Sequence, residues 1–99
     1  MRPIHIAQLD KPRPVLVLTR ELARPVLRSV TVAPITSRVR GLAVEVPVGR
    51  RNGLQERSAV SCDNVQTIPV TSLGRLVGYL YDDEEPLLTD AILAAFDLA

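Results

Sequence analysis

The sequence predicts a mainly β protein that ends in a single helix, an α+β fold. The 99-residue chain contains short apolar runs rich in Val and Ile, most of them stopped by Pro, Gly, Asn or Asp. Residues 42–48 alternate between apolar and small or polar positions, the period of a strand with one buried face. After residue 81 the apolar spacing becomes helical. We expect several short antiparallel strands and then one helix, in one domain over residues 1–99.

The stretch that organises the chain is residues 30–48, which we interpret as a hairpin. Val30 and Val32 are in phase in its first half, and the alternating run of residues 42–48 forms its second half. The connector between them, residues 36–41, carries two arginines and two hydroxyls. Such a loop can bind an anion, or it can be a solvated hairpin tip. On this segment alone the solvated tip is the more ordinary interpretation.

The other expected strands flank this hairpin. Residues 4–9 and 14–18 read as the first two strands, joined by a turn, and the unbroken apolar run of 14–18 predicts burial on both faces. Residues 19–29 are expected to form a loop with one helical turn. Three more short strands follow the polar connection of residues 49–57, whose Asn52-Gly53 pair is a strong turn signal. They are residues 58–62, 66–70 and 76–80.

The terminal helix is predicted by one apolar stripe. Acidic residues at 82–85 suit the start of such a helix, where they cap it and oppose its positive end. Pro86 is tolerated only in a first helical turn. The stripe consists of Leu87, Leu88, Ala91, Ile92, Ala95 and Phe96.

The net charge of +1 conceals an uneven distribution. Residues 1–81 carry all 12 Lys and Arg against five acids, giving +7, while residues 82–99 carry six acids and no Lys or Arg, giving −6. Eleven of the 12 cations are Arg, whose planar fork suits phosphate. The basic body therefore predicts an anionic partner. The arginine-favouring codons of a GC-rich genome would produce the same composition.

The composition also limits the chemistry. No apolar run approaches 18 residues and no signal peptide pattern opens the chain, so we expect a cytoplasmic protein that does not enter a membrane. A single Cys62 excludes an internal disulfide and a cysteine-only metal site, and a single His5 excludes a two-histidine site. Neither a phosphate-binding glycine loop nor a Ser-His-Asp signature is present. We expect no metal and no cofactor.

Three polar residues stand at the ends of predicted strands. Arg13 immediately precedes the strand of residues 14–18, Thr36 ends the first half of the predicted hairpin, and Asp63 follows the strand of residues 58–62. Loops held by a rigid sheet are where functional sites are built. Each of the three residues, taken singly, is also an ordinary strand terminator.

Four segments, taken in order, resemble the MazF/PemK family of ribonuclease toxins from bacterial toxin–antitoxin pairs. They are residues 11–18 (Lys-Pro-Arg-Pro-Val-Leu-Val-Leu), 32–36 (Val-Ala-Pro-Ile-Thr), 60–68 (Val-Ser-Cys-Asp-Asn-Val-Gln-Thr-Ile) and 73–78 (Leu-Gly-Arg-Leu-Val-Gly). The resemblance covers nearly the whole chain. It implies a small SH3-like antiparallel β-barrel of the MazF/PemK/CcdB type with a C-terminal helix, which acts as a homodimer and is neutralised by a cognate MazE-like antitoxin.

The same resemblance implies an endoribonuclease toxin of a type II toxin–antitoxin system. Such toxins cleave single-stranded RNA at a short sequence without a metal, through attack of a ribose 2′-OH that leaves a 2′,3′-cyclic phosphate and a 5′-OH. The family's catalytic Arg and Thr match Arg13 and Thr36, and the proposed base of the PemK branch matches Asp63. We expect Arg13 to act as acid or charge stabiliser and Thr36 to bind a phosphate oxygen.

Flanking residues are expected to bind the RNA strand. Arg38 and Arg40 would hold neighbouring phosphates, and Ser37, Asn64 and Gln66 would read bases.

Two departures from the family pattern bear on specificity. Ser61 stands where the PemK branch has an arginine assigned as an acid. Only residues 10–12 separate the first two strands, where the family usually has a long loop containing Gly and Glu. The short loop predicts a more open site.

Two other functional classes remain open from the sequence. One is a gyrase-binding toxin of the CcdB type, which has the same fold and no enzymatic activity. The absence of Trp and the C-terminal Phe-Asp-Leu-Ala of residues 96–99 count against it. The other is an inactive SH3-like domain that binds nucleic acid or protein.

Overall fold

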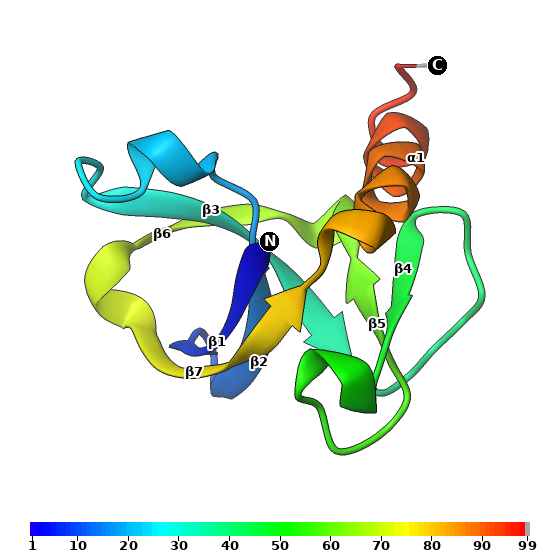
Figure 1. Cartoon of the computed structure of the whole chain (residues 1–99), viewed down its shortest axis with the longest axis horizontal. Coiled ribbons are helices and arrows are strands. Elements are labelled where there is room, and N and C mark those ends of the chain that lie inside the picture. Colours follow the sequence, from blue (N-terminus) through cyan, green and yellow to red (C-terminus); the bar gives the residue numbers. More distant parts are fainter. Residues whose placement is uncertain (99) are drawn as a thin grey trace.

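The computed structural model describes residues 1–98 (Figure 1). Ala99, the last residue of the predicted domain and of the Phe-Asp-Leu-Ala end, lies outside the described residues. The strands are β1 (Arg2–Gln8), β2 (Pro12–Val17), β3 (Ser29–Thr36), β4 (Glu45–Val48), β5 (Ser58–Ser61), β6 (Gln66–Pro69) and β7 (Leu73–Leu80), and the α-helix is α1 (Glu85–Ala95). Short 3₁₀ turns between them are η1 (Glu21–Ala23), η2 (Arg50–Asn52), η3 (Cys62–Asn64), η4 (Val70–Ser72) and η5 (Asp82–Glu84).

The strands form one antiparallel sheet that curls into a half-barrel (Figure 1). Its order is β4-β5-β3-β2-β1-β7, and β6 pairs with β3 outside this path. β3 pairs with β2, β5 and β6 along different parts of its length, which bends the sheet around it. The predicted fold class, many short strands followed by one helix, is confirmed.

The predicted hairpin of residues 30–48 is wrong. β3 and β4 do not pair with each other, because β5 lies between them and pairs antiparallel with both. Val60 of β5 faces Ile35 on one side and Val46 on the other. The true hairpin is β4–β5, which is closed by the polar connection of residues 49–57.

The alternating run of residues 42–48 predicted too long a strand. Its first part is a turn, and β4 begins only at Glu45. The Glu45 carboxylate accepts hydrogen bonds from the backbone N–H groups of Arg40, Gly41 and Leu42, at 2.8 to 3.4 Å. These bonds fold the chain back before β4 begins, and Gly41 supplies the positive φ of 73° that the fold-back needs. Leu42 is consequently 47% exposed, while Val46 is buried.

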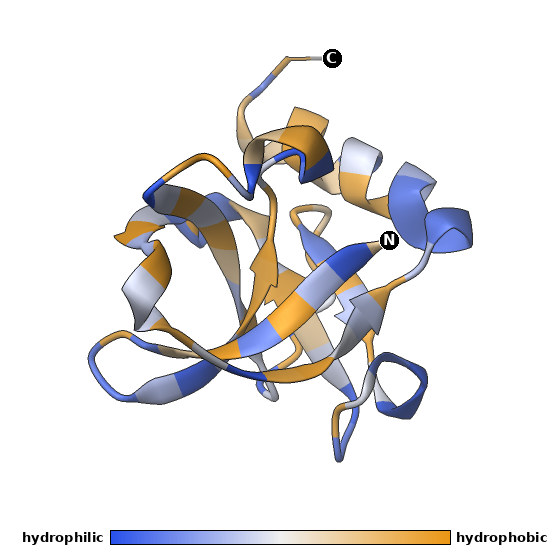
Figure 2. Cartoon of the chain, turned by 60° about the vertical axis from the view of Figure 1, so that its left-hand side comes forward, coloured by the Kyte–Doolittle hydropathy of each residue, from blue (hydrophilic) through white to orange (hydrophobic). Residues whose placement is uncertain are grey.

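The hydrophobic core lies on both faces of β2, as its unbroken apolar run predicted. Val15, Leu16 and Val17 are all buried. Leu16 joins a cluster beneath α1 that includes Ile4, Val60, Leu80 and Leu88. Val15 and Val17 join a second cluster with Ala7, Val30, Val32 and Ile68. Figure 2 shows apolar residues along the strands of the curled sheet, with hydrophilic residues gathered in the connections.

The helix buries only part of its predicted stripe. Leu88 and Ala91 are buried, and Ile92 and Ala95 pack against the same cluster. The two ends of the stripe, Leu87 and Phe96, are 47% and 51% exposed. Pro86 lies in the first turn, as predicted.

The acids at the start of the helix bind the body of the protein, and no side chain caps α1 at its N-cap residue, Glu84. Asp82 pairs with the N-terminal amino group at 2.8 Å, Asp83 with Arg51 at 2.7 Å and Glu85 with Arg2 at 2.9 Å. These long-range ion pairs fasten the acidic C-terminal segment to the basic body.

The connection between β4 and β5 is fixed to β7 by a buried asparagine. Asn52 is 2% exposed and donates to the Tyr79 carbonyl and to the Glu84 carboxylate, both at 2.9 Å, while its oxygen accepts from the Gly49 N–H at 3.0 Å. Backbones touch beside it, since a Cβ on Gly78 would lie 2.1 Å from the Asn52 carbonyl oxygen. The connection is therefore a rigid wall beside β7.

None of the helices described in residues 1–98 has the length and apolar content needed to cross a membrane.

Candidate active site

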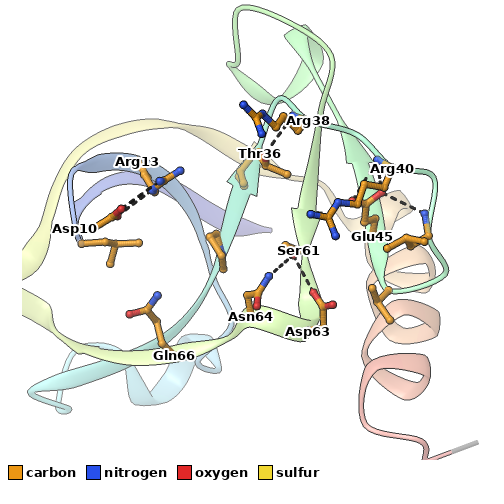
Figure 3. A pocket seen from close by; sticks show the side chains of 15 residues that line it. Asp10, Arg13, Thr36, Arg38, Arg40, Glu45, Ser61, Asp63, Asn64 and Gln66 are labelled. Atoms are coloured by element: carbon orange, nitrogen blue, oxygen red, sulfur yellow. Dashed lines mark hydrogen bonds and ion pairs between the residues drawn. The ribbon is translucent and has the colours of Figure 1, made fainter.

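An open cavity of about 500 Å³ lies where β2, β3 and the β5–η3 corner approach one another (Figure 3). We call it cavity 1. Seven of the eight predicted site residues line it, although they come from three separate parts of the chain. They are Arg13, Thr36, Arg38, Arg40, Asp63, Asn64 and Gln66. The eighth, Ser37, lines a neighbouring cavity instead.

Arg13 is held by a carboxylate that the sequence reasoning overlooked. Its Nε and Nη2 donate to the two carboxylate oxygens of Asp10 at 3.0 and 3.2 Å (Figure 3). This bond lowers the pKa of Asp10 to about 2 and raises the pKa of Arg13. Two of the five guanidinium N–H groups are thereby used, and three remain for a ligand.

Thr36, the last residue of β3, begins the loop that carries the two arginines. Its Oγ1 accepts a hydrogen bond from the backbone N–H of Arg38 at 3.0 Å. The hydroxyl proton stays free to be donated. Within residues 1–98 the side chains of Arg38 and Arg40 have no ion-pair partner, so both remain free to bind an anion.

Asp63 lies in a chain of hydrogen bonds at the η3 turn. Asn64 Nδ2 donates to Ser61 Oγ at 2.9 Å, and Ser61 Oγ donates to Asp63 Oδ1 at 2.9 Å (Figure 3). Because Asn64 occupies the serine oxygen as an acceptor, the serine proton is directed to Asp63. The second carboxylate oxygen, Oδ2, remains able to accept a proton.

The neighbouring Cys62 is unsuited to catalysis. Burial raises the pKa of its thiol to about 11, and the charge of Asp63 adds to the increase. The thiol is therefore neutral at pH 7, whereas a nucleophilic cysteine needs the thiolate.

Three polar residues of cavity 1 were missed as site residues. The Asp10–Arg13 spacing of three residues across a turn could have signalled their ion pair. Ser61 was noted only because it stands where the PemK branch has an arginine. Glu45 gave no local signal, because its contact with the loop depends on β4 pairing with β5.

Among residues 1–98, no group of three or more His, Cys, Asp or Glu side chains is arranged to hold a metal ion.

The fold and the cavity together define a small curled β-sheet protein with an open cavity, lined by three arginines, at the ends of its strands. The sequence profile of PemK-like, MazF-like toxins of type II toxin–antitoxin systems matches residues 3–96. The chain belongs to this family, and the resemblance seen in the sequence is confirmed.

Individual relatives agree with this assignment. The chain is 68% identical over 98 residues to endoribonuclease MazF3 of Mycobacterium tuberculosis H37Rv, a match that covers 99% of this chain and 95% of the relative. It is 40% identical over 86 residues to the probable endoribonuclease MazF5 of the same strain, covering 86% and 79% of the two chains.

Solved structures show the same fold. The M. tuberculosis toxin MazF-mt6 superimposes with a TM-score of 0.96 at 67% identity, covering 99% of each chain. An endoribonuclease from a mycobacterial species, solved in complex with its cognate antitoxin, superimposes with a TM-score of 0.86 at 19% identity, covering 98% of this chain and 93% of the other.

Proposed function

We propose that this protein is an endoribonuclease toxin that acts in the cytoplasm and cleaves single-stranded RNA at a short sequence. The observation that carries this proposal is the convergence of Arg13, Thr36 and Asp63 on one open cavity from three separated segments. The 68% identity to a relative named as an endoribonuclease supports the same activity.

The proposed reaction uses the substrate's own nucleophile. The ribose 2′-OH attacks the adjacent phosphorus, the bond from phosphorus to the 5′-oxygen of the next nucleotide breaks, and the products are a 2′,3′-cyclic phosphate and a 5′-OH. Intramolecular attack gains from proximity, since nucleophile and phosphate are already held together. No metal is needed to make hydroxide in this reaction.

Each candidate catalytic residue has a separate task. Asp63 accepts the 2′-OH proton on the oxygen that Ser61 leaves free. Arg13 directs its remaining N–H groups to the phosphate oxygens as negative charge builds there, and Thr36 donates its hydroxyl proton to a phosphate oxygen. Because the bond to Asp10 raises the pKa of Arg13, we assign Arg13 as charge stabiliser, and the leaving 5′-oxygen takes its proton from solvent water.

The flanking residues bind and read the strand. Arg38 and Arg40 hold neighbouring phosphates by charge-assisted hydrogen bonds. Ser37, Asn64 and Gln66 are the proposed base-reading side chains. Asn64 keeps its carbonyl oxygen for this task, since its amide nitrogen donates to Ser61.

We also propose a homodimer that is neutralised by a MazE-like antitoxin. β4 and β7 stand at the two ends of the strand order, and because the β4–β5 connection already lies against β7, the edge that a second copy would cover is that of β4. The charge of +7 on residues 1–81 attracts a flexible acidic segment. A homologous fold has been solved with its cognate antitoxin, which supports this kind of partner. Light scattering that gave a monomeric mass at micromolar concentration would contradict the dimer.

The decisive test places a single deoxyribose immediately 5′ of the cleaved bond. Loss of that 2′-OH should block the cut while binding stays nearly unchanged, and cleavage of the all-ribose strand should continue undiminished in EDTA. Cleavage of the deoxy-substituted strand, or activity lost in EDTA and restored by magnesium, would overturn the mechanism.

A further inference from the structure

A second open cavity, of about 720 Å³, adjoins cavity 1. We call it cavity 2. Arg13, Thr36 and Arg38 line both cavities, so the candidate catalytic arginine and threonine stand on the boundary between them. Asp63 lines cavity 1 alone, while Lys11 and Arg75 line cavity 2 alone.

Cavity 2 is lined by two cations, Lys11 and Arg75, and by one acid, Glu56, which forms no ion pair with either of them in the part of the chain that the structure describes. Lys11 lies in the turn before β2 and Arg75 lies on β7, and both are exposed. In the described residues 1–98 neither side chain has an ion-pair partner, whereas Arg2, Arg13 and Arg51 all have one. Two cations without an ion-pair partner on one cavity can bind an anion such as a phosphate by charge-assisted hydrogen bonds.

The walls of cavity 2 are formed before any ligand arrives. One wall is the connection from β4 to β5, where Gly53 lies so close to β7 that a Cβ on it would stand 2.2 Å from the Val77 carbonyl oxygen. The next residue, Leu54, packs against the core cluster. Ile6, Ile35 and Val77 add apolar surface to the lining, on which a nucleobase can rest.

The division of residues between the two cavities sets a direction for the RNA strand. The 2′-OH belongs to the nucleotide on the 5′ side of the cut, and its proposed base, Asp63, lines cavity 1 alone. The leaving 5′-oxygen departs roughly in line with the attacking oxygen, on the opposite side of the phosphorus. With the phosphate held by Arg13 and Thr36, the next nucleotide therefore leads away from Asp63, toward cavity 2.

We propose that cavity 2 binds the nucleotide on the 3′ side of the cut, and that Lys11 and Arg75 hold the phosphate that follows it. This inference rests on the proposed function, because it takes the strand direction from the assigned role of Asp63.

The test removes the charge of one RNA phosphate and the charge of the protein side chains proposed to bind it, first separately and then together. A short RNA substrate is prepared with a methylphosphonate in place of the first phosphate 3′ of the cut, and a second substrate with the replacement at the first phosphate 5′ of the cut. Each is assayed with the wild-type protein, with the double variant Lys11→Ala/Arg75→Ala and with Arg40→Ala, which alters cavity 1 alone. Arg28→Ala is the control for lost charge, because Arg28 is exposed, lies outside both cavities and has no ion-pair partner within residues 1–98.

The double variant should lose about tenfold in kcat/KM on unmodified RNA, mainly through KM, and nothing further on the 3′-neutral substrate. On the 5′-neutral substrate its loss should be as large as on unmodified RNA. Arg40→Ala should show the reverse pattern, and Arg28→Ala should stay close to wild type.

A double variant whose loss disappears on the 5′-neutral substrate would reverse the proposed direction. A double variant that loses no more kcat/KM on unmodified RNA than Arg28→Ala would show that Lys11 and Arg75 do not bind the substrate. Binding of the same RNAs with a deoxyribose 5′ of the cut separates this inference from the proposed function. If the double variant weakens binding of the RNA with a charged 3′ phosphate more than binding of the 3′-neutral RNA, the assignment of cavity 2 is supported even if no RNA is cleaved. If it weakens both equally, the inference is wrong.

Discussion

Arg13 enters cavity 1 with its guanidinium already bonded to Asp10, three residues earlier, through two hydrogen bonds of 3.0 and 3.2 Å. The turn between β1 and β2 is too short to form a flap over the site, and it places a carboxylate beside the arginine instead. The pair fixes the plane of the guanidinium, so that its remaining N–H groups are presented in one orientation.

Asp10→Ala should therefore lower kcat by about tenfold, with a smaller effect on KM, because Arg13 loses its fixed orientation and must be ordered in the transition state. The effect should act through the arginine. Made together with Arg13→Lys, the same change should cost little more. Steady-state cleavage of one RNA oligonucleotide by the four proteins measures this, and an equal loss in both backgrounds would show that Asp10 acts elsewhere.

The Asp10–Arg13 pair also predicts a titration. The pKa of Asp10 is about 2 in the folded protein, below the value of about 3.9 for an unfolded aspartate. Its stabilising contribution is thus complete above pH 4 and is lost as the pH falls through 2. NMR titration of the Asp10 carboxyl carbon should give a midpoint near 2 that rises toward 4 in Arg13→Ala. A wild-type midpoint near 4 would mean that the pair does not persist in solution.

Arg13→Ala and Thr36→Ala should each abolish cleavage while thermal melting stays close to wild type, because both side chains lie at the rim of the core. Thr36→Ser is the matched control. It keeps the oxygen that accepts from the Arg38 N–H and the proton proposed to meet the phosphate, so it should retain most activity. An active Arg13→Ala protein would remove the centre of the proposed mechanism.

Asn52→Ala should destabilise the protein by about 3 kcal/mol, since it leaves the buried Glu84 carboxylate and the Gly49 N–H with lost partners. Asn64→Ala removes an exposed amide and should change the free energy of unfolding by less than about 0.5 kcal/mol. Urea unfolding of the two variants gives the comparison. Equal stabilities would mean that Asn52 does not anchor the β4–β5 connection.

Local patterns predicted most of the elements, because strand runs, turn residues and a helical stripe are encoded within a few positions. Val15 to Val17 are buried on both faces of the sheet, and Pro86 lies in the first helical turn, as their sequence context indicated. Strand order is a long-range property. The insertion of β5 between β3 and β4 depends on which apolar faces meet, and no pattern within residues 30–48 carries that information.

In the candidate site, too, local features were predicted and long-range contacts were not. Arg13, Thr36 and Asp63 were selected by family resemblance and by their places at strand ends, and the sheet brings them to one cavity. Ser37 was predicted to read bases together with Asn64 and Gln66, yet it lines cavity 2 and not cavity 1, because the chain bends at the residue that follows β3. The hydrogen bonds from the loop to the Glu45 carboxylate also could not be predicted from the sequence, since they depend on the pairing of β4 with β5.

The position of β5 has a consequence for synthesis of the protein. A ribosome delivers β3 and β4 well before β5, yet both strands need β5 as their shared neighbour. Until residue 61 has left the exit tunnel, the nascent chain lacks the strand that joins Thr36 to the Glu45 loop, and Asp63 arrives later still. Domains fold as units during translation. The chain should therefore emerge harmless to the RNA that encodes it, and its candidate site can assemble only after residues 58–63 have left the tunnel.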